Sequence, residues 1–260
     1  MAQTVAPEIK RHALQVAAAI VAAVALCVDA SGGRTQHAPP PRVLFIGNSL
    51  TASNNLPRLV EAMSESVDSP LHCESIAFGG FSLEDHWKQG SARRAIARGG
   101  WSTVVLQQGP SALPESRVLL VEYVRRFDAE IRRIGARTAL YMVWPTSARR
   151  SDFDGLKTSY ETAAKAVGGL FLPAGDAWRR AWQLDGRVAL YREDGLHPTA
   201  SGTYLAALVI TQRLTGRSIE NVPATITTAS PTIRIVIPPA EATVLKRAAA
   251  QTAERFKQDR

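Results

Sequence analysis

The sequence lacks the short motifs that mark several large classes of protein. It contains no zinc-finger spacing, no Walker loop and no GxGxxG, which argues against zinc-finger, P-loop and dinucleotide-binding proteins. It has only two cysteines, Cys27 and Cys73, and neither belongs to a CxxC pair. We expect Cys73, within a strand-like segment, to be a buried structural thiol. There is also no internal repeat, and 260 residues suffice for one full hydrophobic core.

The net charge is positive, but the basic residues are not concentrated in one stretch of the sequence. Thirty-one Lys and Arg against 23 Asp and Glu give a net charge of +8. The arginines are scattered or paired along helix-like segments, which is typical of solvated helix faces. We therefore predict no nucleic-acid partner.

The first thirty residues differ from the rest of the chain. Lys10 and Arg11 precede an apolar run over 13–28, and small residues around Ala30 follow it. This order is typical of a signal peptide (1–30), and it predicts a secreted or periplasmic protein. The run is short and rich in alanine, so we expect no stable membrane span in the mature chain. An uncleaved anchor, or a lipoprotein modified at Cys27, is the alternative.

Beyond a Gly/Pro-rich linker at 31–41, strand-like and helix-like segments alternate through a single domain at 42–260. This alternation predicts an α/β fold, in which helices cover both faces of a parallel sheet. A final amphipathic helix is expected over 239–256, and the segment 217–238 has no clear pattern. The predicted strands are 42–46, 71–77, 102–107, 137–143 and 169–172. The predicted helices are 55–67, 90–98, 115–134, 156–167, 176–184 and 199–214.

The first strand ends at a candidate nucleophile. Four apolar residues, Val43 to Ile46, stop at Gly47, and Ser49 follows immediately before a helical pattern. Open α/β sheets bind ligands at the carboxyl ends of their strands, where helix N-termini favour negative charge. The alternative is that Gly47-Asn48-Ser49 is only a loop with a helix cap.

A candidate acid–base pair lies late in the chain. Asp194 and His197 are three positions apart in a loop that leads into a helix. A short loop can turn both side chains the same way, so that the carboxylate holds Nδ1 and leaves Nε2 free to act as a base. Among the other histidines only His86 is a rival. The sequence shows no recognisable ligand spacing for a metal, and we predict neither a metal nor a cofactor.

Two further polar loops follow the second and third strands. Gly79-Gly80 allows close backbone approach to a ligand. Gln107, Gln108 and Ser111 follow the third strand, where buried amides are unusual unless a polar donor is needed. We expect all these loops to converge on one site.

Together these residues resemble the SGNH/GDSL hydrolases. Gly47-Asn48-Ser49-Leu50 is similar to the first block of that family, with Asn48 in place of the usual Asp. Gly80 matches the second block, and Asp194 with His197 match the final Asp-x-x-His block. The resemblance covers roughly residues 42–210. It implies a three-layer α/β/α, flavodoxin-like fold with a central parallel sheet of about five strands.

The resemblance also implies a serine esterase or lipase. We expect a Ser49–His197–Asp194 triad that forms an acyl-enzyme on a small-molecule or carbohydrate ester, with the Ser49 and Gly80 N–H groups at the oxyanion. The third block departs from the family, because Gly109-Pro110-Ser111 replaces Gly-x-Asn-Asp. Gln107, Gln108 or Ser111 would then supply the remaining donor. The alternative is a non-catalytic carbohydrate-binding or envelope protein that keeps the fold. The five tryptophans are expected in the core more often than at a ligand.

Overall fold

The computed structural model describes Met1, residues 38–229 and residues 231–257. The expected signal peptide, most of the expected linker, and Cys27 lie outside these residues. Contacts divide the chain into Met1–Pro39 and Pro40–Arg260, and all the described helices and strands belong to the second unit. None of the described helices has both the length and the apolar character that crossing a membrane would require.

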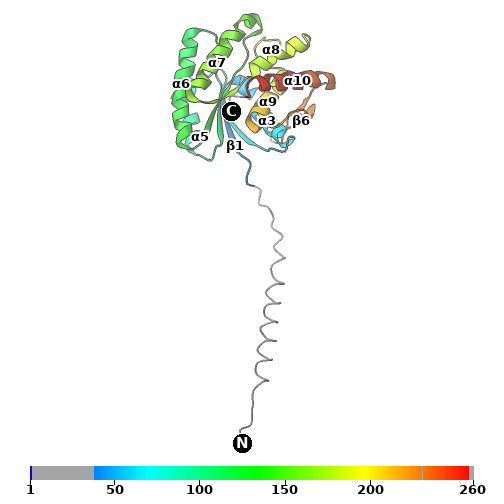
Figure 1. Ribbon diagram of the computed structural model, residues 1–260. Coiled ribbons are helices and arrows are strands. Elements are labelled where there is room, and N and C mark those ends of the chain that lie inside the picture. The colour runs from blue at the N-terminus through cyan, green and yellow to red at the C-terminus, as the bar shows by residue number, and fades with distance from the viewer. Residues whose placement is uncertain (2–37, 230, 258–260) are drawn as a thin grey trace. The chain divides into compact units, whose positions relative to one another are not determined.

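The centre of this unit is a five-stranded, fully parallel sheet in the order β2-β1-β3-β4-β5, which confirms the predicted sheet (Figure 1). After a polar or charged first residue, the inner strands are mostly apolar, and Val43 to Ile46 are at most 1% exposed. Such continuous runs suit strands that are covered on both faces. The strands are β1 (Arg42–Gly47), β2 (His72–Ala77), β3 (Thr103–Leu106), β4 (Arg137–Tyr141) and β5 (Leu170–Leu172).

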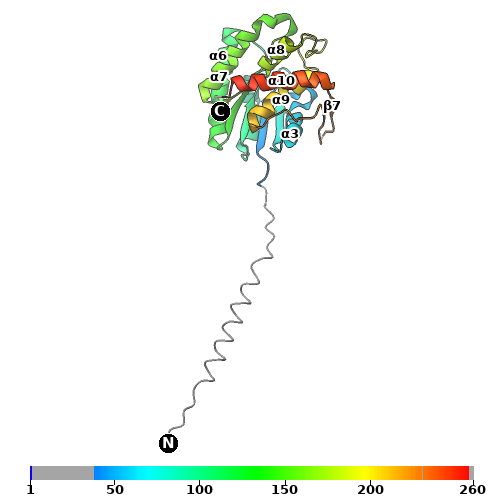
Figure 2. The same ribbon diagram turned by 45° about the vertical axis from the view of Figure 1, so that its right-hand side comes forward.

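Helices cover both faces of the sheet (Figures 1 and 2). On one side α5, α6 and α7 pack together, with α4 against α5 and α6, and on the other side α3, α8, α9 and α10 form the second layer. The helices are α2 (Ser49–Ala52), α3 (Leu56–Glu65), α4 (Leu83–Gln89), α5 (Ser91–Ala97), α6 (Pro114–Arg133), α7 (Phe153–Val167), α8 (Ala174–Leu184), α9 (Ala200–Thr215) and α10 (Pro239–Arg255), with short 3₁₀ turns η1 (Ser53–Asn55) and η2 (Ser147–Asp152).

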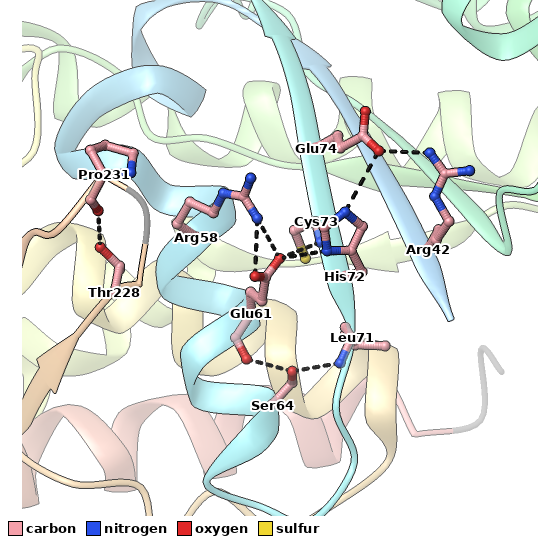
Figure 3. A network of polar contacts seen from close by, with 10 residues as sticks. All are labelled: Arg42, Arg58, Glu61, Ser64, Leu71, His72, Cys73, Glu74, Thr228 and Pro231. Atoms are coloured by element: carbon pink, nitrogen blue, oxygen red, sulfur yellow. Dashed lines mark hydrogen bonds and ion pairs between the residues drawn. The ribbon is translucent and has the colours of Figure 1, made fainter. Parts of the chain in front are cut away.

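Helix α3 shows how a sequence pattern becomes packing. Leu56, Leu59, Val60 and Met63 recur at helical spacing and are all fully buried. The same helix also provides a hydrogen-bond acceptor for the edge strand β2, which has no neighbouring strand on its outer side. Glu61 accepts the Cys73 N–H at 2.6 Å (Figure 3). Cys73 is buried as expected, and burial raises the pKa of its thiol.

Two features were not predicted. Helix α4 begins at a capping box in which Ser82 and Asp85 bond each other's backbone N–H. The segment without a clear pattern contains an antiparallel pair, β6 (Thr225–Thr227) and β7 (Arg234–Val236). The final helix α10 is confirmed, and it packs against α8 and α9.

The strand order places one end of the sheet at a topological switch point. The chain leaves β1 for β2 on one side and then returns past β1 to β3 on the other. In such sheets the loops after the two central strands diverge and leave a crevice at their carboxyl ends. Ser49 follows β1 and Gln107 follows β3, so the candidate residues lie at this crevice.

Candidate active site

A tight turn after β1 presents Ser49 at the start of α2. Gly47 is required there, because a Cβ at this position would lie 2.3 Å from Thr51 Oγ1 and 2.4 Å from Gln107 Oε1. Asn48 caps the helix by accepting the Leu50 N–H at 3.1 Å. Ser49 is thereby held in the first helical turn. Its own N–H has no acceptor among the described hydrogen bonds.

The structure brings Ser49 together with Asp194 and His197. Ser49 Oγ lies 2.9 Å from His197 Nε2, and His197 Nδ1 lies 2.7 Å from Asp194 Oδ2. A carboxylate can only accept, so Nδ1 carries the ring hydrogen and Nε2 accepts from the serine hydroxyl. This is the tautomer that a general base requires.

Asp194 holds its loop as well as the imidazole. Its Oδ1 accepts the backbone N–H groups of Leu196 and His197, each at 2.9 Å. Chiefly the Leu196 N–H, and then the His197 side chain, lower the pKa of Asp194 to about 2. The carboxylate is therefore charged across the neutral range.

Loops after β2 and β3 complete the surroundings of Ser49. Gly80 has φ +75°, a backbone conformation that favours glycine, and its N–H has no acceptor among the described residues. A pocket of about 320 Å³ has Asn48, Gly80, Gln108 and Ser111 in its lining. Asn48 Nδ2 donates to the Phe81 carbonyl at 3.2 Å, which joins the serine turn to the Gly80 loop.

The three candidate donors after β3 differ in what they can reach. Gln108 lines the pocket, its Oε1 accepts the Leu83 N–H at 3.2 Å, and its Nε2 donates to no described acceptor. Ser111 also lines the pocket, but its hydroxyl donates to Ser116 Oγ at 2.8 Å. Of the three, only Gln108 both lines the pocket and has a side-chain donor without an acceptor among the described residues.

The expectation that Gln107 faces a ligand is wrong. Its side chain is fully buried, and its Oε1 accepts from the Asn48 N–H and the Thr51 hydroxyl, each at 2.8 Å. Its Nε2 donates to the Gln108 carbonyl. The Gln107 amide therefore stabilises the turn that carries Ser49, because the buried Asn48 N–H and Thr51 hydroxyl need an acceptor.

His86, the rival candidate for the base, has a different partner. It is fully buried, and its Nε2 lies 2.7 Å from the Gly47 carbonyl oxygen, to which it donates. Burial lowers its pKa and keeps the ring neutral. The described residues also contain no cluster of three or more His, Cys, Asp or Glu that could hold a metal ion.

The tryptophans belong to the core. Trp144 and Trp178 are fully buried and stacked on each other at 3.6 Å, and Trp101 is 4% exposed. Trp87 and Trp182 are partly buried against the same core. None of the five lines the pocket beside Ser49.

Sequence reasoning missed two residues that shape the site. Tyr160 in α7 exchanges hydrogen bonds with the Gln108 backbone, accepting its N–H at 3.0 Å and donating to its carbonyl at 2.5 Å. Asn54, in η1, contacts the loop that precedes α9. No local pattern marks either residue, because the partners lie 52 and more than 140 positions away in the chain.

No protein-family model matches the sequence, and no curated protein matches it. Solved structures do match. A candidate SGNH hydrolase from Slackia heliotrinireducens is 25% identical, with a TM-score of 0.57 over 67% of this chain and 99% of the other. The chain has an SGNH hydrolase-like fold.

Two further structures share this SGNH hydrolase-like fold. A DUF4886 family protein from Bacteroides uniformis has a TM-score of 0.66 at 17% identity, over 85% of this chain and 96% of its own. An acetyl xylan esterase from Geobacillus stearothermophilus has a TM-score of 0.54 at 14% identity, over 67% and 94%. At these identities the likeness concerns the fold.

Proposed function

We propose that the chain is a serine esterase that hydrolyses carboxylic esters. The observation that carries the proposal is the unbroken line of hydrogen bonds from Ser49 Oγ through His197 to the Asp194 carboxylate. Esterases among the solved structures with this fold give independent support.

In the proposed reaction His197 Nε2 takes the proton from Ser49 Oγ as that oxygen attacks the ester carbonyl carbon. The charged Asp194 stabilises the resulting imidazolium. The imidazolium then gives its proton to the departing alcohol, which leaves an acyl group on Ser49. Water, deprotonated by His197, attacks the acyl carbon and releases the acid.

The oxyanion needs donors that are free before substrate arrives. The N–H groups of Ser49 and Gly80 have no described acceptor, and Gln108 Nε2 stands at the same pocket. We assign these three groups to the oxyanion, with Gln108 in place of the third-block Asn of the resemblance. Donors fixed in advance stabilise the developing charge without reorganisation.

The pocket adjoins the serine turn through Asn48, and neither Ser49 nor His197 belongs to its lining. Its volume of about 320 Å³ is sufficient for a short acyl group or a small alcohol. Exposed apolar side chains stand in the same region, since Phe78 packs on Phe81 of the pocket lining and Leu119 belongs to the lining itself. A longer chain would lie over them, and acetylated carbohydrate is the polar alternative.

The test is hydrolysis of p-nitrophenyl acetate, butyrate and octanoate by the purified protein and by Ser49→Ala. Turnover that disappears in the variant supports the proposal, and the chain-length series ranks the acyl groups. Absence of turnover in the unaltered protein, together with binding of acetylated sugars, would favour the carbohydrate-binding alternative.

We also propose that the protein acts outside the cytoplasm, on the order of charge, apolar run and small residues within 1–30. Mass analysis of the exported protein tests this. A chain that starts at Ser31 is expected, whereas a lipid on Cys27 or an intact N-terminus would contradict cleavage at that point.

A further inference from the structure

One side chain joins the segment after Ser49 to the loop that carries His197. Asn54 Nδ2 lies 2.8 Å from Thr203 Oγ1, 3.2 Å from the Thr199 carbonyl oxygen and 3.3 Å from that of Pro198. Its two hydrogens are thus shared among three acceptors, two on the residues directly after His197 and one in the first turn of α9. These partners are 144 to 149 positions away in the sequence.

The oxygen of the same amide is also used. Asn54 Oδ1 accepts from Arg192 at 2.9 Å, and the Arg192 Nε donates to the Pro198 carbonyl at 3.0 Å. One amide therefore contacts the chain on both sides of the Asp194–His197 loop. This arrangement uses both the donor and the acceptor of the carboxamide, which no other short side chain provides in that geometry.

The backbone of Asn54 is held in an uncommon conformation to make these contacts. It has φ +51° and ψ +23° inside η1, a left-handed region that costs energy for a residue with a Cβ. Asparagine tolerates it better than most residues. Asn55 next to it is also left-handed, at φ +52°, but its side chain forms no hydrogen bond with the described residues.

The loop itself fixes the orientation of the imidazole but not its distance from Ser49. Asp194 holds the ring and two N–H groups of its own loop, and the Arg192 N–H donates to the His197 carbonyl at 2.8 Å. Other anchors tie the loop to the segment after β4, through the Trp144 side chain and the Ser147 N–H. Among the described residues, the side-chain hydrogen bonds that join this loop and the start of α9 to residues 49–54 are the Ser49–His197 bond and those of Asn54.

The connection from Asn54 back to Ser49 is short and stiff. Only the single-turn helix α2 and Ser53 lie between them, and Ser53 Oγ donates to the Ser49 carbonyl at 2.7 Å. A displacement of Asn54 is therefore passed on to Ser49. An error of about 1 Å in the placement of reacting groups can cost about 100-fold in rate.

We propose that Asn54 is a positioning residue that sets the distance between Ser49 Oγ and His197 Nε2. The proposal rests on the esterase function proposed above. It assigns to Asn54 a role in the proton transfer that is separate from substrate binding.

The test compares matched substitutions at two neighbouring asparagines of the same backbone conformation. Asn54→Gly keeps the left-handed φ and deletes the amide, and Asn54→Asp keeps the acceptor for Arg192 while removing the donor. Asn55→Gly and Asn55→Asp are the controls. We expect both Asn54 variants to lose between about 10-fold and 100-fold in kcat per active site. For Asn54→Gly, which introduces no charge, KM and the midpoint of the pH profile stay unchanged, because the pocket and the Asp194–His197 pair are intact.

Active sites are counted by labelling Ser49 with a fluorophosphonate, so that unfolded molecules do not enter kcat. The controls at Asn55 are expected to stay within about twofold of the unaltered protein. Normal kcat per labelled site in both Asn54 variants, or an equal loss in the Asn55 controls, would overturn the proposal.

A second measurement needs no turnover. Hydrogen exchange of the peptide that covers 190–199 should become faster in Asn54→Gly and not in Asn55→Gly, because only the first substitution frees this loop from η1. If the unaltered protein hydrolyses no ester, the esterase proposal fails, but the exchange measurement still shows whether Asn54 restrains this loop. Equal exchange in the two variants would refute the role of Asn54.

Discussion

The two sides of Ser49 are built differently, and each contains a histidine. On the base side, His197 has a side chain that is 29% exposed, and both of its ring nitrogens are paired. On the oxyanion side, His86 is fully buried, with Nε2 bound to the Gly47 carbonyl and Nδ1 without a partner among the described residues. Both rings thus contact the short segment from Gly47 to Ser49.

Burial and partners, rather than residue type, separate their roles. A base must exchange protons with substrate and water, and His197 has both the access and a carboxylate to stabilise its charged form. The His86 ring packs against Phe78 and Phe81, and its burial disfavours the charged form. We infer that His86 is a neutral, structural histidine that stabilises the turn before Ser49 by donating to the Gly47 carbonyl.

The largest effect is expected when each histidine is replaced in turn, which tests whether the two have different roles. Replacing the histidine or the serine of a catalytic triad typically lowers kcat by about 10⁶. We expect His197→Ala to lose on the order of 10⁴ to 10⁶ in kcat/KM, whereas His86→Gln keeps most of the activity. Steady-state hydrolysis of p-nitrophenyl acetate measures both, and a larger loss in His86→Gln would reverse the assignment.

The next effect concerns the orientation of the base. In Asp194→Asn the charge is lost and the amide can present its NH₂ to the ring, which favours the wrong tautomer. We expect kcat to fall by about 10⁴. A fall of less than tenfold would mean that the Asp194–His197 bond is not required.

The same carboxylate has a measurable pH signature. The pKa of Asp194 falls from 3.8 to about 2 on folding, so its contribution to stability is complete above the unfolded value and is lost as the pH falls through about 2. The difference in Tm between the unaltered protein and Asp194→Asn should therefore shrink below pH 4. A constant difference from neutral pH down to about pH 2 would contradict the pKa shift.

On the proposed oxyanion side, the next test is whether Gln108 donates to the oxyanion. Gln108→Ala removes the proposed third donor, and loss of one such donor typically lowers kcat by about 10² to 10³. Gln108→Glu keeps the acceptor for the Leu83 N–H, lacks the amide donor and adds a negative charge that repels the oxyanion, so we expect it to lose more than Gln108→Ala. Both variants should lose kcat. An unchanged rate, with a loss in Ser111→Ala instead, would move the donor to Ser111.

The smallest expected effect is on stability, at His86. Its folded pKa lies below 6.5, so the unfolded state binds the proton more readily and stability falls as the pH drops below 6.5. Glutamine can donate to the Gly47 carbonyl without titrating. We expect urea unfolding of His86→Gln to depend less on pH between about 7 and 5 than that of the unaltered protein. Parallel pH dependence would argue against a neutral, buried ring.

Much of the fold follows from local pattern. The continuous apolar runs at Val43–Ile46 and Ala139–Trp144 predict buried parallel strands. The structure places the first in β1 and the first three residues of the second in β4, which ends at Tyr141, whereas Met142 to Trp144 are buried beyond the strand. The three-residue strands β6 and β7 are too short for any periodicity to mark them. The start of helix α4 does have a local signal, because Ser82 and Asp85 have the spacing of a capping box.

The candidate site divides in the same way. Ser49 stands in a strand-end turn, and Asp194 and His197 are three positions apart, so a short motif can mark each place, although the Ser49–His197 contact itself spans 148 positions. Asn54 acts through partners more than 140 positions away, which no local pattern reveals. Gln107 shows the limit of a correct physical argument: a buried amide does need a partner, but its partners are the backbone and hydroxyl groups of the serine turn.

The most direct test of the central claim is to find where the acyl group goes. The protein is mixed with p-nitrophenyl acetate and quenched in acid within the burst phase, and its peptides are mapped by mass spectrometry. The account predicts acetyl on Ser49 Oγ in the unaltered protein and none on the same peptide in Ser49→Ala. Turnover that persists in Ser49→Ala, or acetyl on another side chain as the turnover intermediate, would contradict it.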